Sequence, residues 1–166
     1  MSNAEEKFSD QTLAKMKEAI AEYPDKASAV LPVLQLIQKE KGWVSPASQR
    51  FTAELLSISP ARVKEVVTFY TMFHQQPVGK YHIQVCTNIS CSLRGGEEIF
   101  AHCQKKLGLK GHKDVTPDGL FSLEHVECLA ACERAPAMLL GENYKMELTI
   151  EKVDEIIDRC KKEGSH

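Results

Sequence analysis

Hydrophobic residues in the first 78 positions recur every three or four residues, which is the period of an amphipathic helix. Turn residues at Tyr23-Pro24-Asp25 and at Gly42 interrupt this pattern, and Ser59-Pro60 is a helix cap followed by proline at the first helical position. The predicted helices run from about Asp10 to Tyr23, over Ala27–Lys41, over Pro46–Leu56 and from Pro60 to about Tyr70. Residues 1–78 are therefore expected to form an N-terminal helical bundle.

The pattern changes to alternation after Gly79, and this alternation predicts a strand at Tyr81–Cys86. The elements predicted beyond it are a helix that ends before Gly108, strands at Phe121–Glu127, Ala137–Leu140 and about Tyr144–Leu148, and a helix at about Thr149–Cys160 with Lys161–His166 as a tail. Gly141-Glu142-Asn143 is expected to join the last two strands as a hairpin. The fold class predicted from this order is α+β, with residues 79–166 forming a compact α/β domain after the helical bundle.

Composition and charge exclude some classes of function. Hydrophobic residues make up 43% of the 166-residue chain, which is enough for a core. Lys and Arg total 21 against 23 Asp and Glu, so the chain lacks the basic surface of a nucleic-acid-binding protein, and no nucleic-acid partner is expected. Because the sequence shows neither a signal peptide nor a long apolar stretch, we expect a cytoplasmic protein without direct membrane insertion.

Four cysteines form two tight pairs, Cys86 with Cys91 and Cys128 with Cys132. Each pair is close enough in sequence for one loop to direct both sulfurs toward the same point, so the four thiolates could bind one inorganic centre. The C-x4-C spacing of the first pair occurs in plant-type iron–sulfur proteins, whereas structural zinc more often uses C-x2-C. The spacing favours an iron–sulfur centre and leaves a structural zinc site open.

Other residues are assigned to the core or to local structure. Cys103 and Cys160 fall on the apolar faces of predicted helices, where cysteine packs as a small hydrophobic residue. His82 and His125 could replace a thiolate as ligands, but a hydrogen-bonded or solvated side chain is the favoured interpretation. Arg94-Gly95-Gly96 is too short to hold a dinucleotide, and we expect it to permit close backbone approach near the cysteines.

An aromatic group, Phe69-Tyr70 with Phe73, allows two interpretations. It could be a platform for a partner protein, but aromatic residues at the end of an apolar helix usually pack into a core. Burial is therefore the expectation for all three side chains.

Several separate motifs resemble one family. They are the run from Val67 to Phe73, Gln76-Pro77-Val78-Gly79-Lys80, the loop from Cys86 to Cys91, and the loop from Cys128 through Pro136 to Met138. In order and spacing these motifs resemble the E-type subunit of bacterial NADH:quinone oxidoreductase (respiratory complex I), a thioredoxin-like 2Fe-2S protein. The resemblance covers nearly the whole chain.

This resemblance implies a thioredoxin-like 2Fe-2S ferredoxin domain at residues 79–166. It implies one 2Fe-2S cluster bound by Cys86, Cys91, Cys128 and Cys132, next to a partner subunit that holds flavin mononucleotide (FMN) and NADH. The chain would then pass single electrons without a complete active site of its own, and would be peripheral to the inner membrane through the complex. The matching subunit of an NAD-linked hydrogenase or formate dehydrogenase remains an alternative, and a homodimer of the isolated chain remains open.

The chain departs from the family pattern at Ala130, where the family usually has glycine. An added methyl group could change how closely the backbone approaches a cluster sulfur, but it removes no ligand. The expected effect is therefore on the reduction potential.

Overall fold

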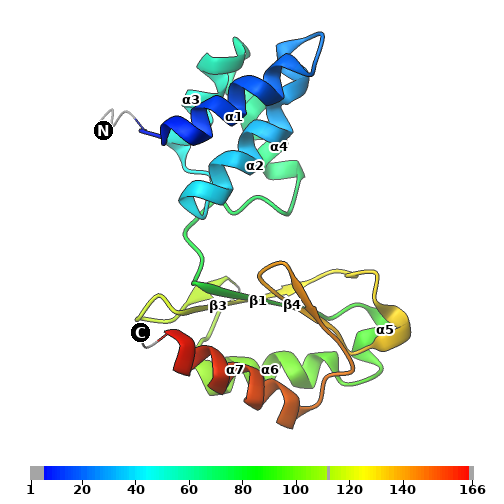
Figure 1. The fold of residues 1–166 in the computed structure, drawn as a ribbon. Coiled ribbons are helices and arrows are strands. Elements are labelled where there is room, and N and C mark those ends of the chain that lie inside the picture. Colours follow the sequence, from blue (N-terminus) through cyan, green and yellow to red (C-terminus); the bar gives the residue numbers. More distant parts are fainter. Residues whose placement is uncertain (1–5, 112, 165–166) are drawn as a thin grey trace. The chain divides into compact units, whose positions relative to one another are not determined.

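The computed structural model describes residues 6–111 and 113–164, which fold into two compact units divided between Pro77 and Val78 (Figure 1). The first unit is helical, and the second combines a mixed sheet with helices. This arrangement agrees with the predicted α+β fold class. Among the described residues, no helix is both long and apolar enough to cross a membrane.

The helices of the first unit are α1 (Asp10–Ala21), a 3-10 turn η1 (Lys26–Ala29), α2 (Val30–Lys41), α3 (Pro46–Leu56) and α4 (Pro60–Phe69). Ser9, Ser45 and Ser59 cap α1, α3 and α4, and each side chain accepts a hydrogen bond from the backbone N–H three residues later. The start predicted for the second helix is too early, because Asp25 caps the 3-10 turn before the α-helix begins at Val30. The core of this unit includes Met16, Val33, Leu34, Ile37, Val44, Val63 and Val67.

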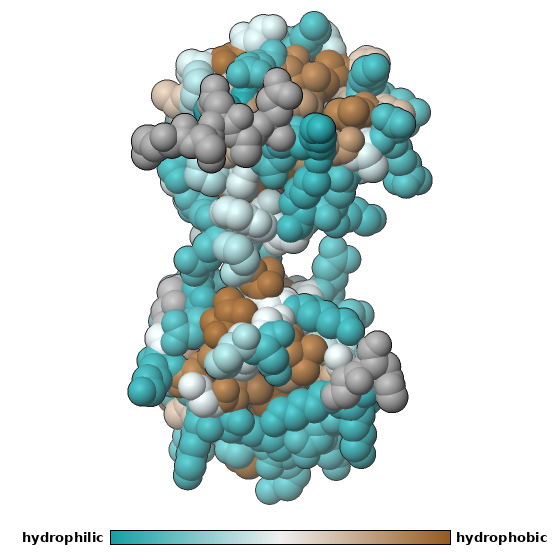
Figure 2. Space-filling model, turned by 90° about the vertical axis from the view of Figure 1, so that its left-hand side faces the viewer, coloured by the Kyte–Doolittle hydropathy of each residue, from teal (hydrophilic) through white to brown (hydrophobic). Residues whose placement is uncertain are grey.

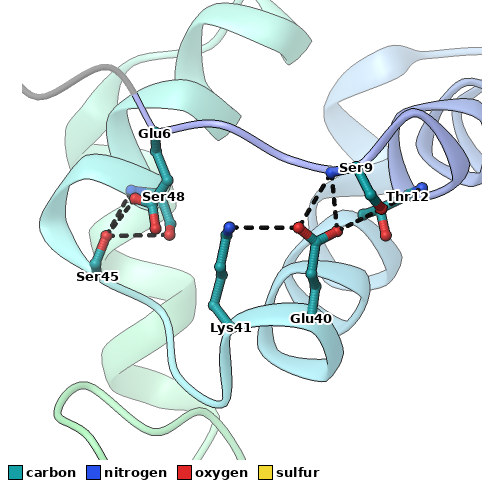
Figure 3. Close-up of polar contacts among 7 residues, drawn as sticks. All are labelled: Glu6, Ser9, Thr12, Glu40, Lys41, Ser45 and Ser48. Carbon is teal, nitrogen blue, oxygen red and sulfur yellow. Dashed lines mark hydrogen bonds and ion pairs between the residues drawn. The ribbon is translucent and has the colours of Figure 1, made fainter.

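Glu40, near the end of α2, is hydrogen-bonded to residues at the N-terminus of α1 (Figure 3). Its carboxylate accepts hydrogen bonds from the Thr12 side chain and from both the N–H and the hydroxyl of Ser9, the latter at 2.9 Å. These bonds lower the pKa of Glu40 to about 2. A carboxylate at a helix N-terminus is also favoured by the helix dipole, so this contact fixes α1 on α2.

The aromatic group at the end of α4 separates in the structure. Phe73 is buried as predicted, but the prediction is wrong for Phe69, which is 76% exposed, and for Tyr70, which is 38% exposed. Val63, Val66 and Val67 already occupy the buried face of α4, and the helix ends at Phe69. The exposed Phe69 ring packs against the Tyr70 ring in a T-shaped arrangement.

The second unit contains a five-stranded sheet in the order β2-β3-β1-β4-β5. Its elements are β1 (Tyr81–Cys86), α5 (Ile89–Ser92), α6 (Gly96–Leu107), β2 (Asp114–Val115), β3 (Phe121–Val126), a 3-10 turn η2 (Cys132–Arg134), β4 (Met138–Leu140), β5 (Asn143–Lys145) and α7 (Ile150–Gly164). Strands β1 and β3 are parallel, and the other neighbours are antiparallel. Figure 1 shows α6 and α7 together on one face of the sheet.

The face of the sheet toward α6 and α7 is apolar. The buried side chains that form this core include Ile83, Val85, Ile99, Cys103, Phe121, Leu123, Met138, Val153, Ile157 and Cys160. Outside the cores, Figure 2 shows hydrophilic side chains over much of the visible surface, with hydrophobic patches on both units.

Three details of the second unit differ from the predictions. The short elements β2 and α5 were not predicted, and α7 continues to Gly164, so the first residues of the predicted tail are helical. The predicted last strand is too long, because β5 ends at Lys145. Glu147 has a φ of 51°, and its N–H bonds to the Arg134 carbonyl, so the chain leaves the β-ladder before Leu148.

The other face of the β1–β3 pair carries a buried polar network. Ser122 Oγ accepts a hydrogen bond from the Gly79 N–H at 2.9 Å and lies 2.7 Å from His82 Nδ1, and the other ring nitrogen of His82 lies 3.3 Å from Glu124. Lys113 Nζ lies 3.0 Å from the second oxygen of Glu124. Burial opposes ionisation of Glu124, but the bonds from His82 and Lys113 outweigh it and lower the pKa of Glu124 to about 2.

Candidate metal centre

Parallel pairing brings the two cysteine loops to one edge of the sheet. Cys86 is the last residue of β1 and lies in register with Val126, the last residue of β3. Because parallel strands end on the same side, the loops that carry Cys91 and Cys128 leave the sheet next to each other. Figure 1 shows α5 and the segment that follows β3 at the same end of the second unit.

The four thiols meet as two pairs. The sulfurs of Cys128 and Cys132 are 3.5 Å apart, and the Cys91 thiol is hydrogen-bonded to Cys86. Two thiolates on one tetrahedral metal with bonds of about 2.3 Å are about 3.8 Å apart, so the Cys128–Cys132 separation suits ligation of one metal. Cys132 also interacts electrostatically with Cys86 and Cys91, which places the two pairs near each other.

This paired arrangement matches the requirements of a 2Fe-2S rhomb, in which each iron takes two thiolates from the protein. Within the described ranges 6–111 and 113–164, no group of three or more Cys, His, Asp or Glu side chains surrounds a position for a single metal ion. The two pairs of thiols provide the number and type of donors that a two-iron centre requires.

Hydrogen bonds join the two loops directly. The Asn88 side chain caps α5 by accepting from the Ile89 N–H, and its Nδ2 donates to Glu127 at 2.7 Å. The Ser90 side chain is hydrogen-bonded to Cys132. Each loop therefore helps to hold the other in position.

Gly96, the first residue of α6, lies close to the backbone of Cys86 and Cys91. A Cβ atom at this position would lie 2.8 Å from the Cys86 carbonyl oxygen and 2.9 Å from the carbonyl of Cys91. The expectation of close backbone approach at Arg94-Gly95-Gly96 is confirmed at Gly96.

The two pairs differ in exposure. Cys86 and Cys91 are 2% and 3% exposed, whereas Cys128 and Cys132 are exposed. The buried pair packs with the small side chains Ala131, Ala135 and Ala137, and Leu129 and Met146 border the group. Such an apolar shell limits solvent access to a centre.

Two of the four thiols, Cys91 and Cys132, hold their protons more strongly than an ordinary thiol. Burial, followed by the contact with Cys86, raises the pKa of Cys91 to about 11, and the hydrogen bond with Cys128 raises the pKa of Cys132. Since thiolates are the form that binds metal, cluster binding at these two residues must release protons.

The remaining candidate residues make other contacts. Cys103 and Cys160 are buried in the core of the second unit, as predicted. His82 belongs to the polar network with Ser122, which agrees with a hydrogen-bonded role. His125 is exposed, and its ring packs edge-on against Phe100.

Sequence reasoning missed residues that organise the cysteine loops. Asn88 was identifiable, because asparagine before a helix is a frequent cap. The hydrogen bond from the Tyr144 hydroxyl to the Leu129 carbonyl, at 3.0 Å, could not be predicted from the sequence, since the two residues belong to different elements.

Residues 16–161 match the model of the thioredoxin-like [2Fe-2S] ferredoxin family. The chain belongs to this family. This membership confirms the expected thioredoxin-like fold and the expected 2Fe-2S cofactor.

Two relatives are similar to most of this chain. The chain is 43% identical over 157 residues to the E-type subunit of the NADH-quinone oxidoreductase of Rickettsia bellii, covering 93% of each chain. It is 41% identical over 140 residues to an E-type subunit, numbered 2, of the NADH-quinone oxidoreductase of Rhizobium meliloti, covering 84% of this chain and 83% of that one.

A solved structure shows the same fold. This structure is an NAD+-reducing [NiFe]-hydrogenase in the air-oxidized state, with a TM-score of 0.71 and 17% identity, and the similarity covers 81% of this chain and 23% of that chain. The fold of this chain therefore also occurs in a protein with little sequence similarity to it.

Proposed function

We propose that this protein is the electron-transfer subunit of an NADH:quinone oxidoreductase. The observation that carries the proposal is the meeting of two thiol pairs at one edge of the sheet, in a chain of the 2Fe-2S ferredoxin family. The similarity to two E-type subunits of NADH-quinone oxidoreductases over most of the chain supports the choice of enzyme.

In this proposal Cys86 and Cys91 ligate one iron, and Cys128 and Cys132 ligate the other. The support is the spacing of each pair and the links between the loops. A 2Fe-2S cluster exchanges one electron at a time. This chain holds the cluster, shields the buried pair with alanine side chains and leaves the other pair at the surface.

The proposed partner is the subunit that binds FMN and NADH. NADH delivers two electrons as a hydride, so a cofactor that can divide the pair must lie between NADH and a one-electron carrier. The exposed Cys128–Cys132 pair offers a short path to such a cofactor. The proposed location, peripheral to the inner membrane, follows from assembly with the rest of the complex.

Iron and acid-labile sulfide analysis of anaerobically purified protein tests the proposal, together with electron paramagnetic resonance (EPR) after reduction by dithionite. We expect about two irons and two sulfides per chain and a spin-half signal. One zinc, no sulfide and no signal would instead support the structural zinc module.

Cysteine variants test the ligand assignment. Cys128→Ala and Cys132→Ala should each lose most of the bound iron and sulfide, because each removes a ligand. Cys103→Ala and Cys160→Ala are matched controls in the same unit and should retain both, since these thiols are buried in the core. Retention of a normal cluster in Cys128→Ala would contradict the assignment.

The alternative enzyme, an NAD-linked hydrogenase or formate dehydrogenase, contains a similar electron carrier. The fold shared with a hydrogenase at 17% identity does not distinguish the alternatives. Affinity purification from the native organism does: recovery with quinone-reducing NADH dehydrogenase activity supports the proposal, and recovery with hydrogenase or formate dehydrogenase activity contradicts it.

A further inference from the structure

A single peptide group connects Tyr144 to a cysteine sulfur. The carbonyl of Leu129 accepts a hydrogen bond from the Tyr144 hydroxyl at 3.0 Å. The N–H of the same peptide group, which belongs to Ala130, donates to Cys128 Sγ at 3.3 Å. Since C=O and N–H point in opposite directions in a trans peptide, Tyr144 and Cys128 lie on opposite sides of this peptide group.

The local structure accounts for this orientation. Ala130 has a φ of 56°, which turns the backbone within the tight loop from Cys128 to Cys132. Tyr144 lies on β5, paired with Leu139 of β4, so the sheet supports its position. The ring is 48% exposed, and its hydroxyl reaches back to the loop.

The two hydrogen bonds of the Leu129–Ala130 peptide group strengthen each other. A donor on the carbonyl oxygen polarises the peptide group and makes its N–H a better donor to sulfur. Reduction adds one negative charge to a 2Fe-2S centre, and a stronger N–H···S bond stabilises the more negative form. The Tyr144 hydroxyl is therefore expected to favour reduction.

We propose that Tyr144 is a positioning residue that raises the reduction potential of the centre through the Leu129–Ala130 peptide group. This inference rests on the proposed function, because it requires a cluster bound to Cys128. It deepens that function, because it gives a residue outside the cysteine loops a role in setting the reduction potential.

The test is a comparison of full-length Tyr144→Phe with wild type by EPR-monitored redox titration. We expect iron and sulfide content to be unchanged and the midpoint potential to be lower in the variant. Tyr81→Phe is the matched control: it removes the same hydroxyl in the same unit, where that group lies 3.5 Å from Glu163, and its potential should equal that of wild type.

A spectroscopic readout separates this role from a merely structural one. In reduced wild-type protein, the Ala130 N–H should give an exchangeable-proton coupling in electron–nuclear double resonance, and this coupling should weaken in Tyr144→Phe. Lower thermal stability with an unchanged potential and coupling would overturn the inference. If wild-type protein holds no iron or sulfide, the proposed function fails and the inference falls with it, whereas a loaded cluster with equal potentials in both proteins overturns the inference alone.

Discussion

Ala130 adopts a backbone conformation that L-amino acids seldom occupy. Its φ of 56° lies in the left-handed region, where a Cβ atom costs about 1–2 kcal/mol. In this loop the Ala130 N–H donates to Cys128 Sγ. The methyl group at this position therefore strains the loop without blocking the contact.

We predict that Ala130→Gly stabilises the second unit by about 0.5–1 kcal/mol. Removal of the left-handed strain outweighs the greater flexibility of glycine in the unfolded chain. Ala131→Gly is the control, and it should destabilise the unit, because Ala131 has a φ of −118° and is buried. Urea denaturation followed by circular dichroism measures both, and equal effects of the two substitutions would contradict this explanation.

The sequence allowed the ligand candidates to be predicted but not the residues that orient them. Cys86, Cys91, Cys128 and Cys132 stood out because their spacing is local. Tyr144 reaches a carbonyl fifteen positions away in sequence, and such a contact exists only after β5 has folded against the rest of the unit. Phe69 was wrongly predicted to be buried, because a hydrophobic residue at a helix end does not reveal which side of the helix is already packed.

At the scale of elements, the first cysteine pair depends on how α6 packs. The helix begins at Gly96, and the absence of a side chain there lets its first turn contact the backbone of Cys86 and Cys91. A longer side chain would have to displace backbone atoms.

We expect Gly96→Ala to reduce the iron and sulfide content of purified protein substantially. The added methyl group would overlap the carbonyl groups of Cys86 and Cys91 and push the pair out of position. Gly108→Ala, at the other end of α6, is the control, because a Cβ atom there meets no atom within 4 Å and only its φ of 69° is strained. Normal cluster content in Gly96→Ala would show that α6 can shift without cost to the site.

The larger elements were predictable because each carries its own periodicity. The α-helices of the bundle, the β4–β5 hairpin and α7 follow from apolar patterns and turn residues. Strand β2 has only two residues, too few for a pattern, and it forms because Asp114 and Val115 pair with Leu123 and Ser122 of β3. The end of β5 could not be predicted from the sequence either, because the residues after it form backbone hydrogen bonds to Arg134 and Pro136 instead of to the sheet.

At the scale of the whole molecule, each unit has a hydrophobic core of its own. Trp43, the single tryptophan of the chain, belongs to the first unit, and the buried Glu124 belongs to the second. These positions allow the stability of the units to be followed separately.

We predict that Glu124→Gln destabilises the second unit by about 1–3 kcal/mol at pH 7 and leaves the Trp43 fluorescence transition unchanged. The folded-state pKa of about 2 lies below the ordinary value of 4.5, so ionised Glu124 contributes its full stabilisation above pH 4.5 and loses it as the pH falls toward 2. The difference between wild type and variant should therefore shrink to roughly half by about pH 3. Urea denaturation of the full chain, monitored by circular dichroism and fluorescence, measures this, and a difference that stays constant over this pH range would exclude the ionic role of Glu124.

The uneven burial of the two cysteine pairs has an electronic consequence for a cluster bound as proposed. A charge near the surface is stabilised by water, whereas a charge held by Cys86 and Cys91 lies among alanine side chains. Cys128 and Cys132 would therefore hold the added charge on the side where water stabilises it, and the Ala130 N–H that bonds to Cys128 Sγ adds to this stabilisation. The protein would then give and take electrons through the one face that carries Cys128 and Cys132.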